Sequence, residues 1–193
     1  MTSSPTIART PVNLSKAALR KTLLAARRDL SDDARRCWDQ AIKAAVIAWW
    51  KMQPSPTLGV YWPLRGEPDL QAAYAELAAL GVGLALPVVQ EKDAALLFAS
   101  WQPGEPMVQD AMGVAVPARL RLLPCPPALL VPCLGFNPER LRLGYGGGFY
   151  DRTLAVAPRP ATLGVAYACM KASFAGEAHD IALDAIVTER GLL

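Results

Sequence analysis

The sequence is poor in the residues that most often build metal and redox sites. It has one histidine, His179, and four cysteines that stand 88, 8 and 36 residues apart. Zinc sites and redox motifs need several of these side chains at short spacing, so the sequence argues against both. We interpret Cys37, Cys125, Cys133 and Cys169 as reduced and mostly buried small side chains.

Long hydrophobic runs are also missing. The longest, at 44–50 and 128–131, are much shorter than the roughly 18 residues that a membrane span needs. The first nine residues lack the apolar stretch of a secretory signal. Glycine and proline, at 14 and 17 of 193 residues, are too few for a fibrous or disordered chain. We therefore expect a folded cytoplasmic protein without a membrane partner.

The net charge is small, at +3, but it is unevenly distributed. Residues 1–36 hold eight lysines and arginines against three aspartates, a balance of +5, and the remainder carries −2. Ser15 is a candidate N-cap for a helix on which Lys16, Arg20 and Arg27 share one stripe. The stripe is either a solvated basic face or a surface for an anionic ligand, and composition leaves both readings open.

Capping residues and hydrophobic periodicity predict four helices. The first follows Ser15, and a second N-cap, Ser31, opens a helix that extends to about Lys51. Shorter helices are predicted over 70–80 and 149–157.

The predicted strands alternate with these helices. They lie at 57–62, 82–89, 95–101, 128–134, 162–168 and 185–188, with an irregular segment at 111–127. The first two strands and the helix between them form a βαβ unit, which implies a mostly parallel sheet covered by helices. We expect an α/β fold, a single three-layer αβα domain over residues 1–193 with a Rossmann-like sheet.

The most informative segment is a glycine-rich loop between a predicted strand and a predicted helix. Open α/β sheets bind ligands at such strand ends. The four glycines within 144–148 allow backbone N–H groups to converge on phosphate oxygens, and Arg142 adds a fixed cation. The loop is no Walker A motif, and Phe149 replaces the third glycine of the dinucleotide fingerprint. A glycine-rich turn can be purely structural, but Arg142 and Asp151 favour a phosphate site.

Residues 142–152, Arg-Leu-Gly-Tyr-Gly-Gly-Gly-Phe-Tyr-Asp-Arg, resemble the signature of the 5-formyltetrahydrofolate cyclo-ligase family, also called methenyltetrahydrofolate synthetases. Three further blocks are similar to the family in the same order: 16–20 with the Arg27-Arg28 pair, then Glu67, then 177–184. The resemblance therefore extends over nearly the whole chain, and the chain length also fits.

This resemblance implies an enzyme that converts 5-formyltetrahydrofolate and ATP into 5,10-methenyltetrahydrofolate, ADP and phosphate, with Mg²⁺ as cofactor. The formyl amide is a poor electrophile, and phosphorylation of its oxygen creates a leaving group that N10 can displace. Such chemistry asks the protein mainly to position two substrates and to neutralise phosphoryl charge. The implied partners are the folate and ATP, with no nucleic acid, and we expect a monomer.

The resemblance also implies roles for individual residues. Arg142 and Asp151 are the implied catalytic residues, and Asp151 and Asp180 are the implied Mg²⁺ ligands, partly through water. The implied ATP-binding residues are Lys16, Arg20, Arg142, Leu143, Gly144, Tyr145, Gly146, Gly147, Gly148, Phe149 and Tyr150. The implied folate-binding residues are Trp62, Glu67, Tyr145, Gly148 and Phe149.

Several of these residues have a purely structural alternative. Glu67 could simply favour a helix N-terminus, Trp62 could belong to the core, and Asp180 could sit in a surface turn. We expect the lone His179 to orient its neighbours rather than to transfer protons, and Asp184 to be a structural partner.

The chain departs from the family pattern around the loop. Asn137 stands for an aspartate, Arg140 for a glycine and Phe149 for a tyrosine, while Gly147 stands where some relatives carry a lysine. We expect Arg140 to alter the entrance turn and Phe149 to lack a hydroxyl that could bond a ligand. Because Gly147 is not a lysine, we expect the other cations of the site to balance more of the phosphate charge.

Two other functions remain open. One is a catalytically weak relative that binds nucleotide or RNA through the basic N-terminal helix, although no recognised RNA module is present. The other is a different phosphate-handling α/β enzyme, such as a sugar-phosphate isomerase-like protein, which requires the four similar blocks to be accidental.

Overall fold

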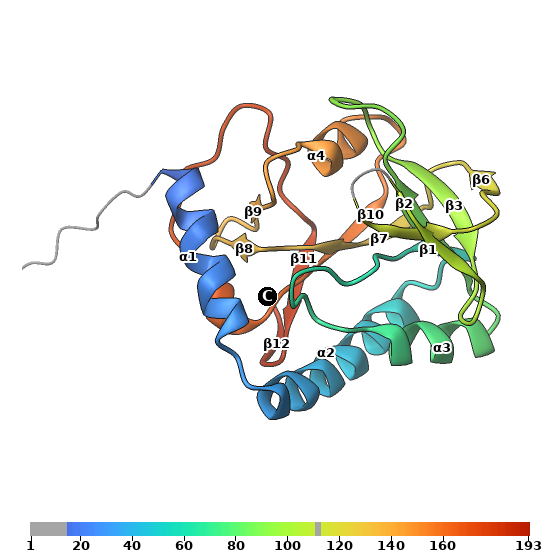
Figure 1. The fold of residues 1–193 in the computed structure, drawn as a ribbon, viewed down its shortest axis with the longest axis horizontal. Helices are drawn as coiled ribbons and strands as arrows, with labels where there is room; N and C mark the ends of the chain where they lie inside the picture. Colours follow the sequence, from blue (N-terminus) through green and yellow to red (C-terminus); the bar gives the residue numbers. More distant parts are fainter. Residues whose placement is uncertain (1–14, 111–112) are drawn as a thin grey trace, which may run out of the picture.

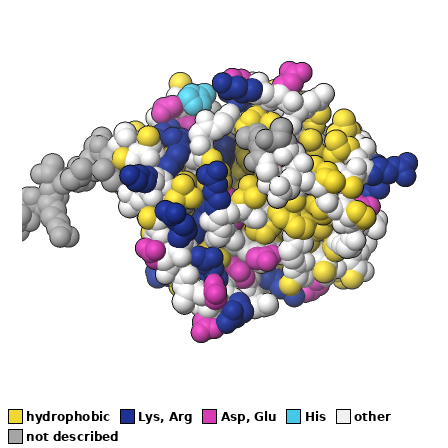
Figure 2. Space-filling model, in the orientation of Figure 1, with side chains coloured by type: hydrophobic (Ala, Val, Ile, Leu, Met, Phe, Trp, Pro, Cys, Tyr) yellow, Lys and Arg dark blue, Asp and Glu magenta, His cyan; other side chains and the backbone are white. Residues whose placement is uncertain are grey.

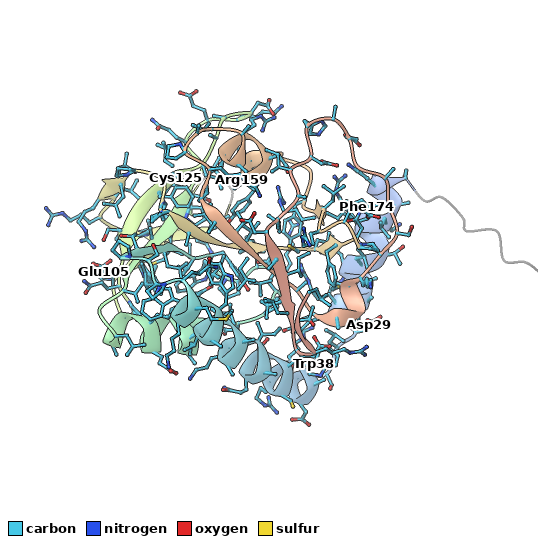
Figure 3. The ribbon with its side chains drawn as sticks, turned by 180° about the vertical axis from the view of Figure 1, so that it is seen from behind. Asp29, Trp38, Glu105, Cys125, Arg159 and Phe174 are labelled. Carbon is cyan, nitrogen blue, oxygen red and sulfur yellow. The ribbon has the colours of Figure 1, made fainter. Side chains whose placement is uncertain are left out.

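The computed structural model describes residues 15–110 and 113–193. Arg9 of the basic N-terminal segment and residues 111–112 lie outside this part of the chain. The helices are α1 (Lys16–Arg28), α2 (Asp32–Met52), α3 (Gln71–Ala79), α4 (Phe149–Leu154) and the 3-10 turn η1 (Ala168–Met170). In Figure 1, α2 and α3 cover one face of a central sheet and α4 lies over the other, and Figure 3 shows the same layers from behind. The expected three-layer α/β fold is confirmed.

The first two helices begin at the predicted N-caps. The Ser15 hydroxyl accepts a hydrogen bond from the backbone N–H of Ala18 at 3.2 Å, and Ser31 accepts one from Ala34 at 3.3 Å. Each bond satisfies a backbone donor that has no partner within its own helix. Local chemistry therefore decides where the basic helix α1 starts.

Within the described residues, eight strands form the central sheet. Their order is β12 (Gly191–Leu192), β11 (Ala185–Thr188), β10 (Ala161–Val165), β7 (Ala128–Pro132), β1 (Thr57–Gly59), β2 (Gly83–Val88), β3 (Leu97–Trp101) and β6 (Leu122–Leu123). The five strands from β11 to β2 run parallel, and β12, β3 and β6 pair antiparallel at the edges. The predicted βαβ unit is β1, α3 and β2, and the mostly parallel sheet is confirmed.

Two small hairpins lie outside this sheet. One joins β4 (Met107–Gln109) to β5 (Ala115–Pro117), and the other joins β8 (Gly135–Phe136) to β9 (Arg142–Leu143). The second hairpin carries the start of the glycine-rich loop and was predicted only as loop. Its strands are too short for a periodic signal.

Some predicted strand ends were wrong. The strand at 57–62 ends at Gly59, because the Tyr61 carbonyl accepts a hydrogen bond from the Tyr74 hydroxyl at 3.0 Å instead of continuing the ladder. The strand at 162–168 ends at Val165, and Tyr167 then caps the 3-10 turn. The two-residue strand β12 was not predicted.

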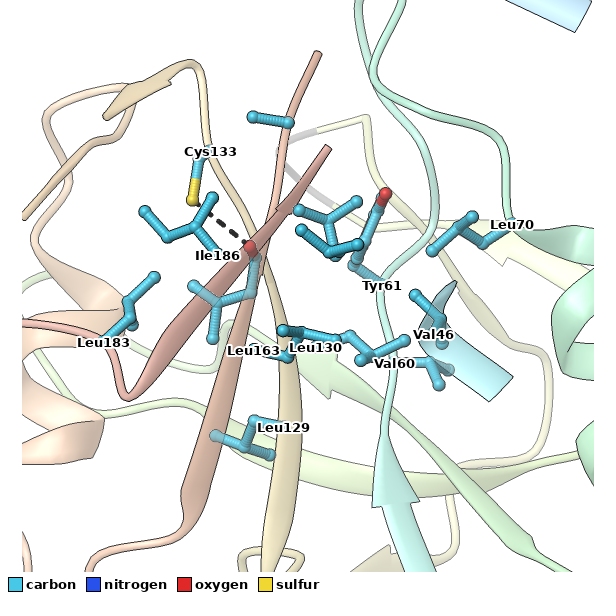
Figure 4. Close-up of a cluster of buried hydrophobic side chains, with 14 of the residues drawn as sticks. Val46, Val60, Tyr61, Leu70, Leu129, Leu130, Cys133, Leu163, Leu183 and Ile186 are labelled. Carbon is cyan, nitrogen blue, oxygen red and sulfur yellow. Dashed lines mark hydrogen bonds between the residues drawn. The ribbon is translucent and has the colours of Figure 1, made fainter. Parts of the chain in front are cut away.

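The central strands are buried on both faces. All of β7 from Ala128 to Val131 is buried, as expected for a parallel strand between two helical layers. Leu130, Leu163 and Val46 of α2 belong to one cluster of buried side chains (Figure 4). Cys133 joins this cluster, but the other three cysteines are exposed, so the prediction of mostly buried thiols was wrong. No helix in the described ranges is both long and apolar enough to cross a membrane.

Candidate active site

A cavity of about 620 Å³ opens where the parallel strands β1, β2 and β7 end. Every residue that the sequence analysis assigned to a site lines this cavity. Lysines and arginines gather on the side of the molecule where α1 lies, and hydrophobic side chains gather on the opposite side (Figure 2). The cavity therefore offers a basic side and an apolar side to its ligands.

The glycine-rich loop closes the basic side. Gly148 has the left-handed φ of 65° and is the N-cap of α4, a conformation that favours glycine. At Gly147 a Cβ atom would stand 2.6 Å from Cε2 of Phe149, so the ring needs a glycine beside it. The loop carbonyls of Gly144 and Gly147 accept hydrogen bonds from Arg20 at 2.8 Å and Arg152 at 2.7 Å. Arginines of α1 and α4 thus hold the loop from both sides.

Two ion pairs occupy the same side of the cavity. Arg142 Nη2 lies 2.8 Å from Asp151 Oδ2, and Lys16 Nζ lies 2.6 Å from Asp180 Oδ2 and 3.1 Å from Glu177 Oε1. Partial burial disfavours both charges of the second pair. The hydrogen bonds and charges of Lys16, Asp180 and Glu177 together outweigh this effect, and they lower the pKa of Asp180 and raise that of Lys16. The implied metal ligands are therefore paired with the implied phosphate-binding cations.

Glu67 is 5% exposed and lies at the end of the loop that follows β1. Its Oε2 accepts from the backbone N–H of Leu64 at 2.9 Å, and its Oε1 accepts from the Tyr145 hydroxyl at 2.8 Å. Burial raises the pKa of Glu67 above its ordinary value, although these hydrogen bonds and nearby arginines act in the opposite direction. The helix N-terminus does not need Glu67, because Asp69 accepts from the backbone N–H of Gln71 at the start of α3.

The aromatic residues divide between cavity and core. Trp62 lines the cavity while its ring packs edge-on against buried Trp101, with 5.9 Å between centroids. Phe149 and Tyr150 are half-buried and line the cavity from α4, and the Arg142 guanidinium lies 5.1 Å from the centre of the Tyr150 ring. Trp62 therefore lines the cavity and also packs against the hydrophobic core.

The residues that depart from the family pattern stabilise the loop entrance. Asn137 is buried, donates to the Phe174 carbonyl at 3.1 Å and accepts from the backbone N–H of Leu141 at 2.9 Å. An aspartate could not make the first bond. Arg140 has a left-handed φ of 59°, and its Nε donates to the Leu183 carbonyl at 3.0 Å. A glycine would adopt this backbone conformation without strain. Here the hydrogen bond from Arg140 to the C-terminal segment compensates for the strain.

The two residues from the closing block have different surroundings. His179 is exposed, lines the rim of the cavity and lies 3.4 Å from Glu177. Asp184 accepts hydrogen bonds from the backbone N–H and the hydroxyl of Thr162, at 2.7 and 2.8 Å, and pairs with Arg159. This arrangement agrees with a structural role for Asp184.

The sequence did not indicate most of the apolar residues that line the cavity, nor the cation Arg65. The additional lining includes Tyr61, Leu64, Arg65, Val89, Leu96 and Val114. Several of these residues follow the carboxyl ends of β1 and β2, and this position at the strand ends is the signal that could have identified them. Arg27, predicted only as part of the basic stripe, is fully buried against Tyr145.

The donor set for a metal ion is small. Within residues 15–110 and 113–193, no group of three or more His, Cys, Asp or Glu side chains could hold a metal ion by itself. Asp151 and Asp180 supply carboxylates to the cavity. Mg²⁺ commonly binds one or two carboxylates and completes its shell with water and substrate phosphates, and these residues fit that mode.

The fold and the cavity together define an α/β protein that binds ligands at the ends of parallel strands, as many nucleotide-using enzymes do. The sequence identifies it further. Residues 12–189 match the model of the 5-formyltetrahydrofolate cyclo-ligase family, and the chain belongs to that family of ligases.

Individual relatives agree with this identification. The 5-formyltetrahydrofolate cyclo-ligase of Mycolicibacterium smegmatis is 30% identical over 195 residues, which cover 93% of this chain and 96% of that protein. The solved 5,10-methenyltetrahydrofolate synthetase of Mycoplasma pneumoniae superposes with a TM-score of 0.76 at 26% identity, covering 91% of this chain and 99% of that one. The synthetase of Aquifex aeolicus gives 0.75 at 28% identity, covering 93% and 92%.

Proposed function

We propose that this chain catalyses the ATP- and Mg²⁺-dependent cyclisation of 5-formyltetrahydrofolate to 5,10-methenyltetrahydrofolate, with release of ADP and phosphate. It acts as a monomer in the cytoplasm, with residues 1–193 as a single domain. The observation that carries the proposal is a single cavity that is lined both by the basic, glycine-rich loop and by the buried acceptor Glu67. Its volume of about 620 Å³ suits two organic ligands whose reacting ends meet.

The basic side is the proposed site of the ATP triphosphate. Lys16 and Arg20 reach it from α1, and Arg142 reaches it from β9. Residues 143–150 form the cradle between them. These cations attract the triphosphate and hold its terminal phosphoryl group toward the second substrate. Asp151 and Asp180 would hold Mg²⁺, which would supply further neutralisation of the phosphate charge.

The opposite side is the proposed site of the folate. An ionised Glu67 can only accept hydrogen bonds, and the pteridine ring offers N–H donors. Trp62 and Phe149 are flat apolar surfaces for the ring, and Val89 and Leu96 extend the wall. Glu67 thereby orients the pteridine, so that its N5-formyl group faces the nucleotide.

The chemistry follows from this arrangement. The formyl oxygen attacks the terminal phosphorus of ATP, and the bond to the bridging oxygen of ADP breaks. N10 then adds to the activated formyl carbon, and the carbon–oxygen bond to phosphate breaks as the five-membered ring closes. The departing phosphate takes up the proton that N10 loses. Both steps are governed by positioning and by charge neutralisation, which Lys16, Arg20 and Arg142 provide. No step needs a histidine, in agreement with the exposed position of His179.

The experiment is a direct assay of the purified chain. The protein is mixed with 5-formyltetrahydrofolate and Mg²⁺-ATP, and the absorbance of the methenyl product is followed. We expect product formation that depends on ATP, with ADP and phosphate released in equal amounts. No product, under conditions in which a known cyclo-ligase is active, would refute the proposal.

The geometry of α1 supports this function over nucleic-acid binding. A non-catalytic binder would present the basic stripe to solvent, but Arg27 is fully buried and Lys16 is paired with Asp180 and Glu177. Lys16 and Arg20 line the cavity and Arg27 is buried, so the stripe faces inward, whereas Lys21 and Arg28 of the same helix are exposed. Gel-shift measurements with single-stranded RNA at physiological salt should accordingly detect only weak, salt-sensitive binding.

A further inference from the structure

The buried arginine of α1 has an unusual environment. Arg27 is 0% exposed, and it is not among the residues that line the cavity. Its Nε donates to the Arg65 carbonyl at 3.1 Å, and its Nη2 donates to the hydroxyl of Tyr145. Within the described part of the chain, Nη1 is buried without a hydrogen-bond partner. Burying such a cation is costly, and no carboxylate contacts it directly.

The donors and acceptors around Tyr145 fix the direction of its hydroxyl. A guanidinium has only donors, so the Tyr145 oxygen must accept from Arg27. The single phenolic hydrogen is then left for Oε1 of Glu67, at 2.8 Å. Burial and the nearby Glu67 charge raise the pKa of Tyr145, and the phenol keeps its proton. Arg27, Tyr145 and Glu67 thus form a one-way chain of hydrogen bonds, which we call the Arg27 relay.

The Arg27 relay has a consequence for Glu67. One oxygen of its carboxylate accepts from Tyr145 and the other from the Leu64 backbone, so its plane is set. Each oxygen keeps a lone pair for a further donor. The Tyr145 ring is also held in place, because the Arg27 and Arg65 guanidinium carbons lie 5.8 and 5.3 Å from its centre.

We propose that Arg27 is a positioning residue for the folate substrate: through the Tyr145 hydroxyl it holds the Glu67 carboxyl group oriented toward the N–H donors of the pteridine. The inference rests on the proposed function, since it explains what orients the Glu67 carboxyl group that accepts hydrogen bonds from the folate. Arg27 acts at a distance from the substrate, because it contacts Tyr145 and Arg65 and does not itself line the cavity.

A purely structural role for Arg27 is the alternative to be separated. Its Nε also holds the Arg65 carbonyl, so its removal affects the loop after β1 whatever its effect on Glu67. The effect of Arg27 through Tyr145 must therefore be separated from its effect through Arg65. A double-mutant cycle on the folate KM does so, because residues that act through one hydroxyl give effects that do not add.

The experiment compares wild type, Arg27→Met, Tyr145→Phe and the double variant. For each protein, KM for 5-formyltetrahydrofolate, KM for ATP and kcat are measured. We expect either single substitution to raise the folate KM about tenfold, and the double variant to match the single ones. The ATP KM should change much less, because Tyr145→Phe removes only the hydroxyl and keeps the loop backbone that is proposed to hold the nucleotide. Arg28→Met, which removes the exposed neighbouring cation, should leave both KM values unchanged.

Three results would overturn the proposal. One is a double variant whose folate KM rises by the product of the single effects, about a hundredfold. Another is an equal rise in the KM values of both substrates, which indicates general damage. If Arg27→Met does not fold, Tyr145→Phe decides alone, and an unchanged folate KM in it refutes the relay. A wild-type chain without activity would instead refute the proposed function, so the two failures are distinguishable.

Discussion

Single residues in this cavity work as pairs of opposite charge. Asp151 is held by Arg142 and Asp180 by Lys16, and each pair is mostly buried. The two members of such a pair hold each other in fixed positions. Binding of a triphosphate then requires these pairs to share their charges with the ligand. Substitutions at the pairs should therefore change catalysis more than they change folding.

Asp151→Asn removes a charge while keeping the size of the side chain. We expect kcat to fall about a hundredfold, because Arg142 loses the group that orients it and the proposed metal ligand is lost. Stability should fall by only about 2 kcal/mol, since the pair is not fully buried. Steady-state kinetics and urea unfolding measure the two effects. Asp93→Asn, at the exposed partner of Arg152, is the matched control and should leave kcat unchanged.

The ionisation of Glu67 can be tested by its pH dependence. Burial raises the pKa of Glu67 in the folded state, so the stability linked to its proton is fully present below its unfolded value of 4.5. This stability is lost as the pH rises through the folded pKa. Glutamine does not titrate, so the stability of Glu67→Gln lacks this pH dependence. The difference in the free energy of unfolding, Glu67→Gln minus wild type, should therefore increase over this pH window and level off above it. Urea unfolding across the acidic to neutral range measures the difference, and a constant value would contradict the prediction.

At the level of elements, the glycine-rich loop is shaped by what surrounds it. The left-handed Gly148 starts α4, and Phe149 turns back over Gly147. Arg20 of α1 holds the other end of the loop through the Gly144 carbonyl. The loop conformation thus depends on side chains of two helices, and its glycines leave room for those side chains.

Gly147→Ala should distort this loop. The added methyl group would stand 2.6 Å from the Phe149 ring, and relieving that contact costs about 1–3 kcal/mol. We expect a lower melting temperature and a higher KM for ATP. The second substitution Phe149→Ala should restore much of the lost stability, because it removes the clashing ring. Equal melting temperatures for Gly147→Ala and wild type would contradict this account.

At the scale of the whole molecule, the cavity gathers segments that are far apart in the chain. The start of α1, the ends of three parallel strands, the glycine-rich loop and residues 177–180 all line it. The ion pair between Lys16 and Asp180 joins residues separated by 164 positions. Such a site exists only in the folded state, and ligand binding should therefore stabilise the entire fold.

Substrate binding should raise the melting temperature in proportion to the logarithm of substrate concentration. At a hundred times its Kd, 5-formyltetrahydrofolate should stabilise the protein by about 2.7 kcal/mol. Glu67→Gln should need a roughly tenfold higher concentration for the same stabilisation, since it loses charged hydrogen bonds. Thermal unfolding over a concentration series measures both. A shift that is identical in the two proteins would exclude Glu67 from the folate site.

The sequence by itself determined the features that depend on near neighbours. The caps at Ser15 and Ser31, the βαβ unit and the position of the glycine-rich loop are patterns within a few residues, and each is present as predicted. The family follows from the motifs, which the match over residues 12–189 confirms.

Only the tertiary structure decided which side chains meet. The burial of Arg27 against Tyr145, 118 residues away, and the end of β1 at the Tyr74 hydroxyl leave no local pattern in the chain. The same holds for the pairing of both candidate metal ligands with cations. Helix caps and strand periodicity arise from backbone hydrogen bonds within one segment, whereas the charge network of the cavity arises from the packing of several segments on one sheet.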